Sequence, residues 1–228
     1  MKCYQIKAND AGQRLDRFVQ KVAPRLPVSM LQRSIRIKRI KVNGHRAQNN
    51  QMLTIGDVVE LYLNDEFFMP DEASPLGFLA AGQELDILYE DENLMLVNKH
   101  PGLVVHEDDA GERDTLIARI LRHLYEAGQY NPCDENSFSP ALCNRIDRNT
   151  SGIVIAAKNA QTLRVVNALL RERLIHKYYL CLTHGNLTPP DGLLKGYLVK
   201  DAEANRVQVL DAPAPGAKTA LTSYHTLQ

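Results

Sequence analysis

One stretch of sequence constrains the fold of the surrounding chain more than any other. It is Asn144-Arg145-Ile146-Asp147-Arg148-Asn149-Thr150-Ser151-Gly152, and the apolar run Ile153-Val154-Ile155-Ala156-Ala157 follows it directly. The apolar run has the length and composition of a buried strand. Thr150-Ser151-Gly152 is typical of a turn, so we expect Asp147 at the entrance of that strand.

Asp147 stands between Arg145 and Arg148. Nearby positive charge favours the ionised form of a carboxyl group. An ionised carboxylate can act as a nucleophile or a base, and basic surroundings suit a polyanionic substrate. The alternative is a solvated turn in which Asp147 caps the backbone and the arginines face water.

Composition indicates a globular protein of one large domain, or of a small domain and a medium one. Of the 228 residues, 44% are hydrophobic and 24% charged. The sequence shows no transmembrane-length apolar run and no signal-peptide core at its N-terminus, so we expect a cytoplasmic protein without membrane contact. The four cysteines and the histidines lack metal-ligand spacing, which predicts no metal site.

Charge is distributed unevenly along the chain although the net charge is zero. Residues 1–63 hold 12 Lys and Arg against 4 Asp and Glu, residues 64–140 hold 4 against 17, and residues 141–228 hold 11 against 6. A segment as basic as the first is typical of a surface that binds a polyanion.

The first 63 residues predict two helices followed by a hairpin. Leu15, Phe18, Val19 and Val22 have helical spacing. Ser29 and Gln32 form a capping-box pattern, so we expect a second helix that begins at Ser29 and buries Leu31 and Ile35. Lys41-Val42-Asn43-Gly44 predicts a strand and a tight turn, and residues 58–63 a further strand.

This order of elements resembles an S4-like RNA-binding domain over residues 12–63. The shared motifs are Arg14-Leu15-Asp16-Arg17, the Ser29–Gln32 helix start, Lys41-Val42-Asn43-Gly44 and Gly56-Asp57. In that family the second helix and the turn after it bind RNA phosphates. The resemblance implies RNA contacts from the following basic residues: Arg33, Arg36, Lys38, Arg39 and Lys41.

Residues 64–84 read as a linker, and residues 85–228 as a second domain. In it we expect strands at 85–90, 94–99, 103–106, 153–157 and 177–182, helices at 115–127 and 160–174, and β-hairpins after 185. The predicted fold class is α+β: a small N-terminal domain, then a mixed, largely antiparallel sheet flanked by helices.

The second domain, together with the first, resembles the RluA/RluD-type pseudouridine synthases over nearly the whole chain. The matching motifs are Ile87-Leu88-Tyr89-Glu90-Asp91, the run from Val97 to His106, the stretch from Asn144 to Gly152, and Lys177-Tyr178-Tyr179. The resemblance implies isomerisation of a uridine in RNA to pseudouridine, without a cofactor or a metal.

Site roles follow from the same resemblance, one residue at a time. Asp147 matches the family's nucleophilic aspartate. Arg145 matches the arginine that helps to hold the space left by the flipped nucleotide, and flipping is required because the target atoms are inaccessible in a base stack. Tyr179 matches the tyrosine that packs on the uracil and assists proton removal from C5.

The sequence departs from the family pattern at several places. Asn144 stands where many members have His, Ile146 where they have Leu, and His100 replaces the first Pro of a Lys-Pro-x-Gly turn. The family's "TGR-HQIR-H" segment does not occur before Gln228. On the resemblance, the chain as given therefore lacks a C-terminal part of the catalytic domain, and we expect weak or no activity from it.

Two functions of different classes stay open at this point. The first is an RNA pseudouridine synthase, acting on large-subunit ribosomal RNA by preference, with transfer RNA as the other substrate class. The second is a non-catalytic RNA-binding protein on the same scaffold. A glycosidase needs two placed carboxylates, and only Asp147 stands out. We expect a monomer.

Overall fold

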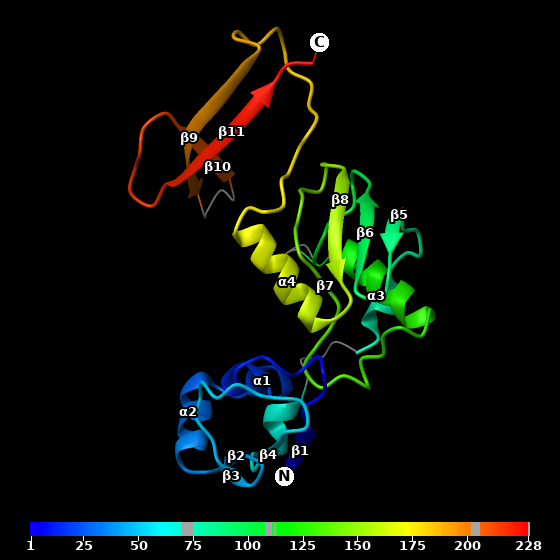
Figure 1. Cartoon of the computed structure of the whole chain (residues 1–228), viewed down its shortest axis with the longest axis vertical. Helices are drawn as coiled ribbons and strands as arrows, with labels where there is room; N and C mark the ends of the chain where they lie inside the picture. Colours follow the sequence, from blue (N-terminus) through cyan, green and yellow to red (C-terminus); the bar gives the residue numbers. More distant parts are fainter. Residues whose placement is uncertain (70–74, 108–110, 112, 202–205, 228) are drawn as a thin grey trace. The chain divides into compact units, whose positions relative to one another are not determined.

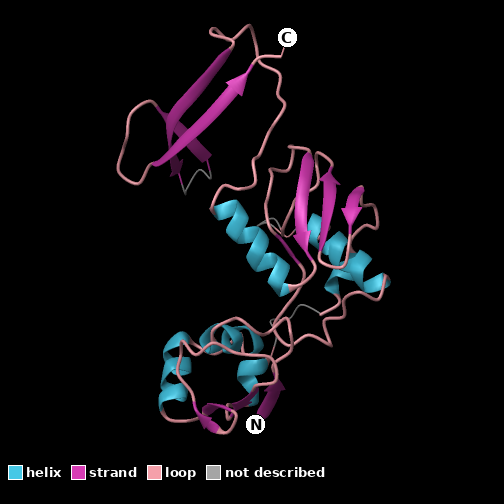
Figure 2. Ribbon diagram, viewed as in Figure 1, coloured by secondary structure: helices cyan, strands magenta, loops and turns pink. Residues whose placement is uncertain are grey.

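The computed structural model describes residues 1–69, 75–107, 111, 113–201 and 206–227. The chain divides into two compact units, Met1–Ile175 and His176–Gln228, and each is described by itself. The first unit contains both helices and strands, and the second unit is made of strands and loops (Figures 1 and 2). The boundaries at residues 63, 84 and 85 stay predictions.

The N-terminal part of the first unit packs two helices against an antiparallel sheet. The helices are α1 (Leu15–Val22) and α2 (Val28–Arg36). The strands are β1 (Lys2–Gln5), β2 (Ile40–Val42), β3 (His45–Arg46) and β4 (Val58–Leu61), in the order β1-β4-β2-β3. The helical spacing of the apolar residues is confirmed, because Leu15, Phe18, Val19, Leu31 and Ile35 are all buried in one core.

Two local predictions about this part had different outcomes. The Asn43-Gly44 turn is confirmed: both residues have positive φ, 53° and 74°, as a two-residue hairpin loop between right-twisted strands requires. The Ser29 cap is wrong. Helix α2 begins one residue earlier with Pro27 as its N-cap, and Leu31 donates its N–H to the Pro27 carbonyl. Proline already holds the extended φ that an N-cap residue adopts, so no side-chain cap is needed.

Residues 64–84 are packed where they are described. They contain two short 3₁₀ helices, η1 (Asp65–Phe68) and η2 (Gly77–Ala80). Phe68 is buried in the N-terminal core, and the Phe78 ring contacts those of Tyr125 and Tyr130. Residues 70–74 of the predicted linker lie outside the described residues.

A second antiparallel sheet forms the rest of the first unit. Its strands are β5 (Ile87–Glu90), β6 (Leu94–Lys99), β7 (Ala141–Leu142) and β8 (Gly152–Ala157), in the order β5-β6-β8-β7. Helix α3 (Leu116–Glu126) covers one face. Its buried Leu116, Ile120 and Leu124 pack against Met95 and Val97 of β6 and against Val154 and Ala156 of β8.

Helix α4 (Ala160–Arg171) follows β8 and contacts it. The helix is shorter than predicted: Arg173 has a φ of 58° and Leu174 is 62% exposed. The predicted strand at 103–106 is reduced to one isolated bridge between Val104 and Thr115. A strand needs a continuous row of hydrogen bonds to a neighbour, and here the chain turns into the loop before α3.

The N-terminal part and the second sheet are joined by a buried carboxylate. Asp10 is 0% exposed and accepts hydrogen bonds from the Lys7 N–H (3.2 Å), from Asn136 Nδ2 (2.7 Å) and from Ser137 Oγ (2.6 Å). Asn9 extends the junction by accepting from the Ala160 N–H at the start of α4. The loop that leads to β7 is therefore tied to the N-terminal part.

The second unit is an antiparallel sheet of β9 (Asp191–Asp201), β10 (Arg206–Leu210) and β11 (Lys218–His225), in the order β10-β9-β11. This confirms the predicted hairpins. The strand predicted at 177–182 is wrong: its run of aromatic and aliphatic residues suggested one, but no described strand pairs with it. Without a hydrogen-bonded neighbour an apolar run does not make a strand, and Tyr178 and Leu182 are fully or nearly fully exposed.

Candidate active site

Asp147 lies on the loop that connects β7 to β8. The loop is attached to β8 by Asn144, whose Oδ1 accepts from the Ile155 N–H (2.8 Å) and whose Nδ2 donates to the Ile153 carbonyl (3.2 Å). Ile146 packs against the core under α3, and the Thr150 N–H donates to the Asp147 carbonyl (3.1 Å). Asn144 thus has a clear local role in place of the family's histidine, and Thr150 closes the predicted turn.

The carboxylate of Asp147 is exposed to solvent. Over the part of the chain that the structure describes, no hydrogen bond or ion pair engages it. Arg145 is also exposed and makes no ion pair with it. The loop therefore fixes the backbone of Asp147 and leaves its side-chain oxygens available to a substrate.

Lys99 holds that backbone in place. It is 1% exposed and ends β6, and its ammonium group donates to three carbonyls, those of His100 (3.0 Å), Leu103 (2.8 Å) and Arg148 (2.8 Å). The Gly102 N–H donates to the same Arg148 carbonyl at 2.9 Å. Lys99 thereby fastens the His100–Leu103 turn to the residue next to Asp147.

The charge of Lys99 is also part of the site's electrostatics. Burial lowers the pKa of Lys99, and the negative charge of Asp147 opposes that shift. The Asp147 carboxylate therefore favours the charged form of Lys99. A buried cation below the loop gives Asp147 a fixed positive neighbour that the Arg145-x-Asp147-Arg148 pattern did not predict.

Gly152 joins the loop to β8. Its φ is 132°, in a region that side-chain-bearing residues rarely adopt, and it pairs with Lys99 across the two central strands. The glycine of the Thr-Ser-Gly turn is thus required by the backbone and not by chemistry. This agrees with the role assigned to it from the sequence.

His106 is the neighbour of Arg145. Burial and the nearby guanidinium group of Arg145 lower the pKa of His106, so the imidazole is neutral at neutral pH. From the sequence we assigned His106, like the other histidines, no metal-binding role. Its proximity to Arg145 places it beside the candidate site.

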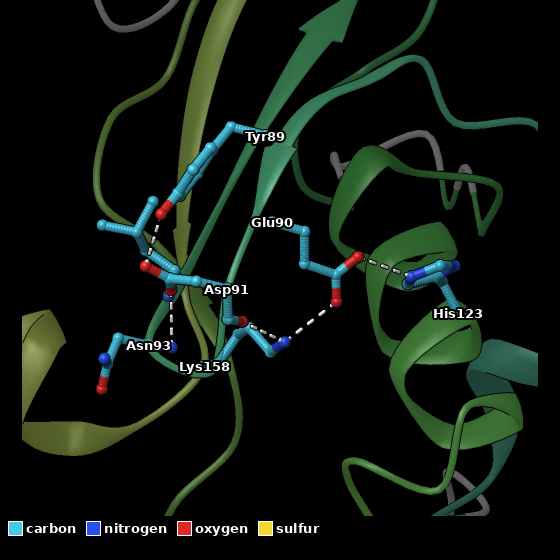
Figure 3. A network of polar contacts seen from close by, with 7 residues as sticks. Tyr89, Glu90, Asp91, Asn93, His123 and Lys158 are labelled. Carbon is cyan, nitrogen blue, oxygen red and sulfur yellow. Dashed lines mark hydrogen bonds and ion pairs between the residues drawn. The ribbon is translucent and has the colours of Figure 1, made fainter.

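A polar network occupies the opposite end of the same sheet (Figure 3). Lys158, which follows β8, binds Glu90 Oε1 at 2.9 Å, and His123 of α3 contacts Glu90 Oε2 at 3.0 Å. Burial would raise the pKa of Glu90, but the hydrogen bonds from Lys158 and His123 outweigh it and lower that pKa. The network links β5, α3 and the end of β8, and it lies away from Asp147 because β8 runs from the Asp147 loop to Lys158.

A cavity of about 560 Å³ lies under the His100–Leu103 turn. Among the residues that line it are Lys99, Leu116, Asp114 and Arg119, whereas Asp147 is not one of them. Arg119 binds Asp114 through two hydrogen bonds, of 2.8 and 2.7 Å. The cavity therefore shares Lys99 and the His100–Leu103 turn with the candidate site, but the Asp147 carboxylate does not line it.

Tyr179 belongs to the second unit, which is described separately, and its side chain is 64% exposed. The five predicted RNA contacts lie on α2, on the connection that leads into β2, and, for Lys41, in β2 itself. Four of them are exposed and Lys41 is half-buried with its ammonium group 5.2 Å from the centre of the Tyr62 ring. Lys38 has a φ of 63° where the chain leaves the helix.

The described residues contain neither a membrane-spanning helix nor a metal-binding cluster. There, no helix is long and apolar enough to cross a membrane. Nor do three His, Cys, Asp or Glu side chains gather there in an arrangement that could hold a metal ion. All four cysteines are free thiols, and burial raises the pKa of Cys143 to about 11.

Comparison with known proteins assigns the class. The model of the RNA pseudouridylate synthase family matches residues 93–228, a range that contains the Asp147 loop, both central strands from Leu94 onward and the second unit. The chain belongs to this family.

Individual relatives agree with that assignment. An uncharacterized RNA pseudouridine synthase of Mycoplasma pneumoniae is 30% identical over 92% of this chain and 64% of its own length. Ribosomal large subunit pseudouridine synthase C of Vibrio cholerae is 30% identical over 96% of this chain and 65% of its own. The chain thus spans somewhat less than two thirds of the length of these relatives. A solved structure, human RNA pseudouridylate synthase domain containing 1, matches 68% of this chain and 54% of its own at 18% identity, with a TM-score of 0.47.

Proposed function

We propose that this protein isomerises specific uridines of RNA to pseudouridine, with Asp147 as the nucleophile. The family match supports the class of reaction. The observation that carries the residue assignment is the combination of an exposed carboxylate with a rigid backbone: no described side chain binds the Asp147 oxygens, while buried Lys99 fixes the adjoining peptide. A nucleophile on a preorganised loop loses little freedom when substrate arrives.

The chemistry follows from these groups. The N1–C1′ glycosidic bond of the target uridine breaks while the Asp147 carboxylate bonds to the sugar or stabilises its positive charge. The freed uracil turns, its C5 bonds to C1′ as the carboxylate leaves, C5 loses its proton, and N1 gains one. The reaction is an internal rearrangement, so atoms and electrons balance without an external oxidant or reductant.

Two further residues have proposed roles in this reaction. Arg145, two positions before Asp147 and exposed, fills the space that the target nucleotide leaves when it flips out. Tyr179 packs on the uracil and assists removal of the C5 proton. Its exposed ring leaves a face free for that contact.

RNA binding is assigned to the N-terminal part, as an S4-like domain. Its basic residues follow one another from α2 through the connection after it into β2: Arg33, Arg36, Lys38, Arg39 and Lys41. Such contacts to phosphates fix position and register. The relatives named for the large ribosomal subunit favour large-subunit ribosomal RNA as the substrate.

The test is pseudouridine mapping of ribosomal and transfer RNA from cells that lack the native gene. We expect one or a few sites to lose pseudouridine, the wild-type gene to restore them, and Asp147→Asn not to restore them although the variant accumulates. Asp211→Asn, a change of an exposed aspartate in the second unit, is the matched control and should restore them.

Two results would contradict this proposal. Restoration by Asp147→Asn would show that another group is the nucleophile. If no site changes when the gene is absent while the protein still binds RNA, the non-catalytic RNA-binding function takes its place.

A further inference from the structure

A second cavity of about 670 Å³ lies in the N-terminal part and is lined by residues of α2 and of the chain that continues from β3. We call it the α2–β3 groove. It is far along the chain from Asp147, and its volume is within the range of roughly 300–1,000 Å³ that is usual for small-ligand sites. The RNA contacts inferred from sequence account for only one of the residues that line it, Arg36.

The groove has an apolar floor and polar walls. Ile35 and Ala47 are 4% and 3% exposed, and they form the floor. Arg36 from α2 and Arg46 from β3 bring two guanidinium groups, and Gln32, Gln48 and Asn49 bring three amides. Within the described ranges, none of these five polar side chains hydrogen-bonds or ion-pairs with another residue.

The backbone of the amide wall is held rigidly. The Asn49 carbonyl accepts from the Asp16 N–H (3.1 Å), the Gln51 carbonyl accepts from the Leu15 N–H (2.8 Å), and the Gln51 N–H donates to the Gln48 carbonyl (3.1 Å). The start of α1 thus fixes the turn at residues 48–51. The side chains of Gln48 and Asn49 project from a fixed backbone while their own hydrogen bonds stay unused.

We propose that the α2–β3 groove binds one unpaired nucleotide of the RNA and selects its base. Guanidinium groups pair with phosphate oxygens and also stack on base planes, while Gln and Asn amides can both donate to and accept from a base edge. The apolar floor contacts the face of a base. A duplex offers phosphates but no free Watson–Crick edge, so the three amides favour a single-stranded occupant.

This inference deepens the proposed function, because it adds base selection to a surface otherwise expected to contact only phosphates. Contacts to phosphates and contacts to a base edge have different effects on RNA binding when they are lost. Loss of a phosphate contact weakens all RNA about equally and reduces salt dependence, whereas loss of an amide changes the preference among RNAs.

The experiment measures binding of the full chain to short single-stranded oligoribonucleotides without uridine, and to a duplex of matched length. The variants are the Gln48→Ala/Asn49→Ala double substitution and Arg36→Gln. Asn50→Ala is the control, because Asn50 is an exposed amide next to the groove but outside its lining. Arg17→Gln, an exposed arginine of α1, is the control for charge.

We expect the double substitution to weaken single-strand binding by about 10-fold, with less difference among oligonucleotides of different base, and to leave duplex binding unchanged. Arg36→Gln should weaken both kinds of RNA and lower the salt slope by about one. Both control variants should bind nearly as the wild type does.

Unchanged single-strand binding in the double variant would overturn the proposal. An equal loss for single strand and duplex would also overturn it, because the amides would then act without reading a base. Uridine-free RNA cannot be isomerised, so this result does not depend on catalysis. Pseudouridine formation in a uridine-containing transcript, measured in parallel, reports separately on the proposed function.

Discussion

Lys99 offers the sharpest test of how the fold positions Asp147. Replacing Lys99 with Met keeps most of the side-chain volume but removes the ammonium group, so the partly buried carbonyls of His100 and Leu103 lose the donor shown for them. The Arg148 carbonyl keeps the Gly102 N–H. Each carbonyl left without a donor destabilises the fold by about 1–3 kcal/mol. Removal of the buried ammonium group offsets part of this loss, because its burial is itself unfavourable. The free energy of unfolding should therefore fall by about 3 kcal/mol.

The effect on reaction should exceed the effect on folding. Without Lys99 the peptide beside Asp147 is held by one hydrogen bond instead of two, and a misplacement of about 1 Å can slow an enzyme about 100-fold. We therefore expect Lys99→Met to form pseudouridine about 100-fold more slowly for each folded molecule. The assay is single-turnover pseudouridine formation by the product of the native gene with and without the substitution, at a temperature where urea titration shows the variant folded.

Lys158→Met is the matched control for this experiment. Lys158 is also a largely buried lysine, 8% exposed, but it binds Glu90 at the opposite end of the sheet. Its loss should lower stability without slowing the reaction of the folded protein. Equal slowing in the two variants, or an unchanged rate in Lys99→Met, would refute the argument that Lys99 acts through the Asp147 loop.

Two other predictions concern stability. Asp10→Ala should lower the free energy of unfolding by about 3 kcal/mol, because the hydrogen bonds from Asn136 and Ser137 are lost at a buried site. Urea titration measures this loss, with Asp65→Ala, a change of an exposed aspartate, as the control. A loss below about 1 kcal/mol would contradict the prediction. Arg119 and the Gly82 N–H hold the pKa of Asp114 at about 2, below the usual 3.8, so the Asp114 charge stabilises the fold above pH 3.8 and that contribution disappears as the pH falls to about 2. Because Asp114 is partly exposed, Asp114→Asn should lower the free energy of unfolding by only about 1 kcal/mol at neutral pH. The stability difference between variant and wild type should shrink as the pH falls from 3.8 to about 2 in unfolding measurements. A difference that stays constant over this range would contradict the role assigned to the Asp114 charge.

Local patterns predicted the helices well because a helix closes its hydrogen bonds within itself. Helices α1, α3 and α4 lie where the apolar spacing placed them, and Val166 of α4 is buried as its face required. The end of α4 was less certain for a physical reason. Leu174 continues the spacing, but the chain leaves the helix at Arg173, and spacing alone does not report where packing stops.

Strands were predicted less reliably because each depends on a partner elsewhere in the chain. Residues 177–182 have the aromatic and aliphatic composition of a strand but no neighbour among the described strands. In contrast, β1 was not predicted, although Lys2 to Gln5 pair with Leu61 to Val58 at a sheet edge. Edge strands combine few buried residues with polar ones, so the signal that would reveal them is weak.

The candidate site shows the same division between local and long-range information. Asp147, Arg145 and the Thr150–Gly152 turn were found because they are adjacent in sequence. Asp10, with partners at 136 and 137, carries no local sign of its role, since a single aspartate in a polar segment is ordinary.

Lys99 is the instructive intermediate case. Side chains on a strand alternate between its two faces, and Met95 and Val97 place the buried face of β6 in phase with position 99. Burial of a lysine in that inward position is unfavourable unless its ammonium group donates hydrogen bonds. The chain reverses at His100-Pro101-Gly102 directly after Lys99, which brings backbone carbonyls within reach of the ammonium group. The alternation therefore predicts a buried ammonium group that organises loops at this end of the sheet, and the loop that follows Asn144 is the one whose carbonyl completes the set.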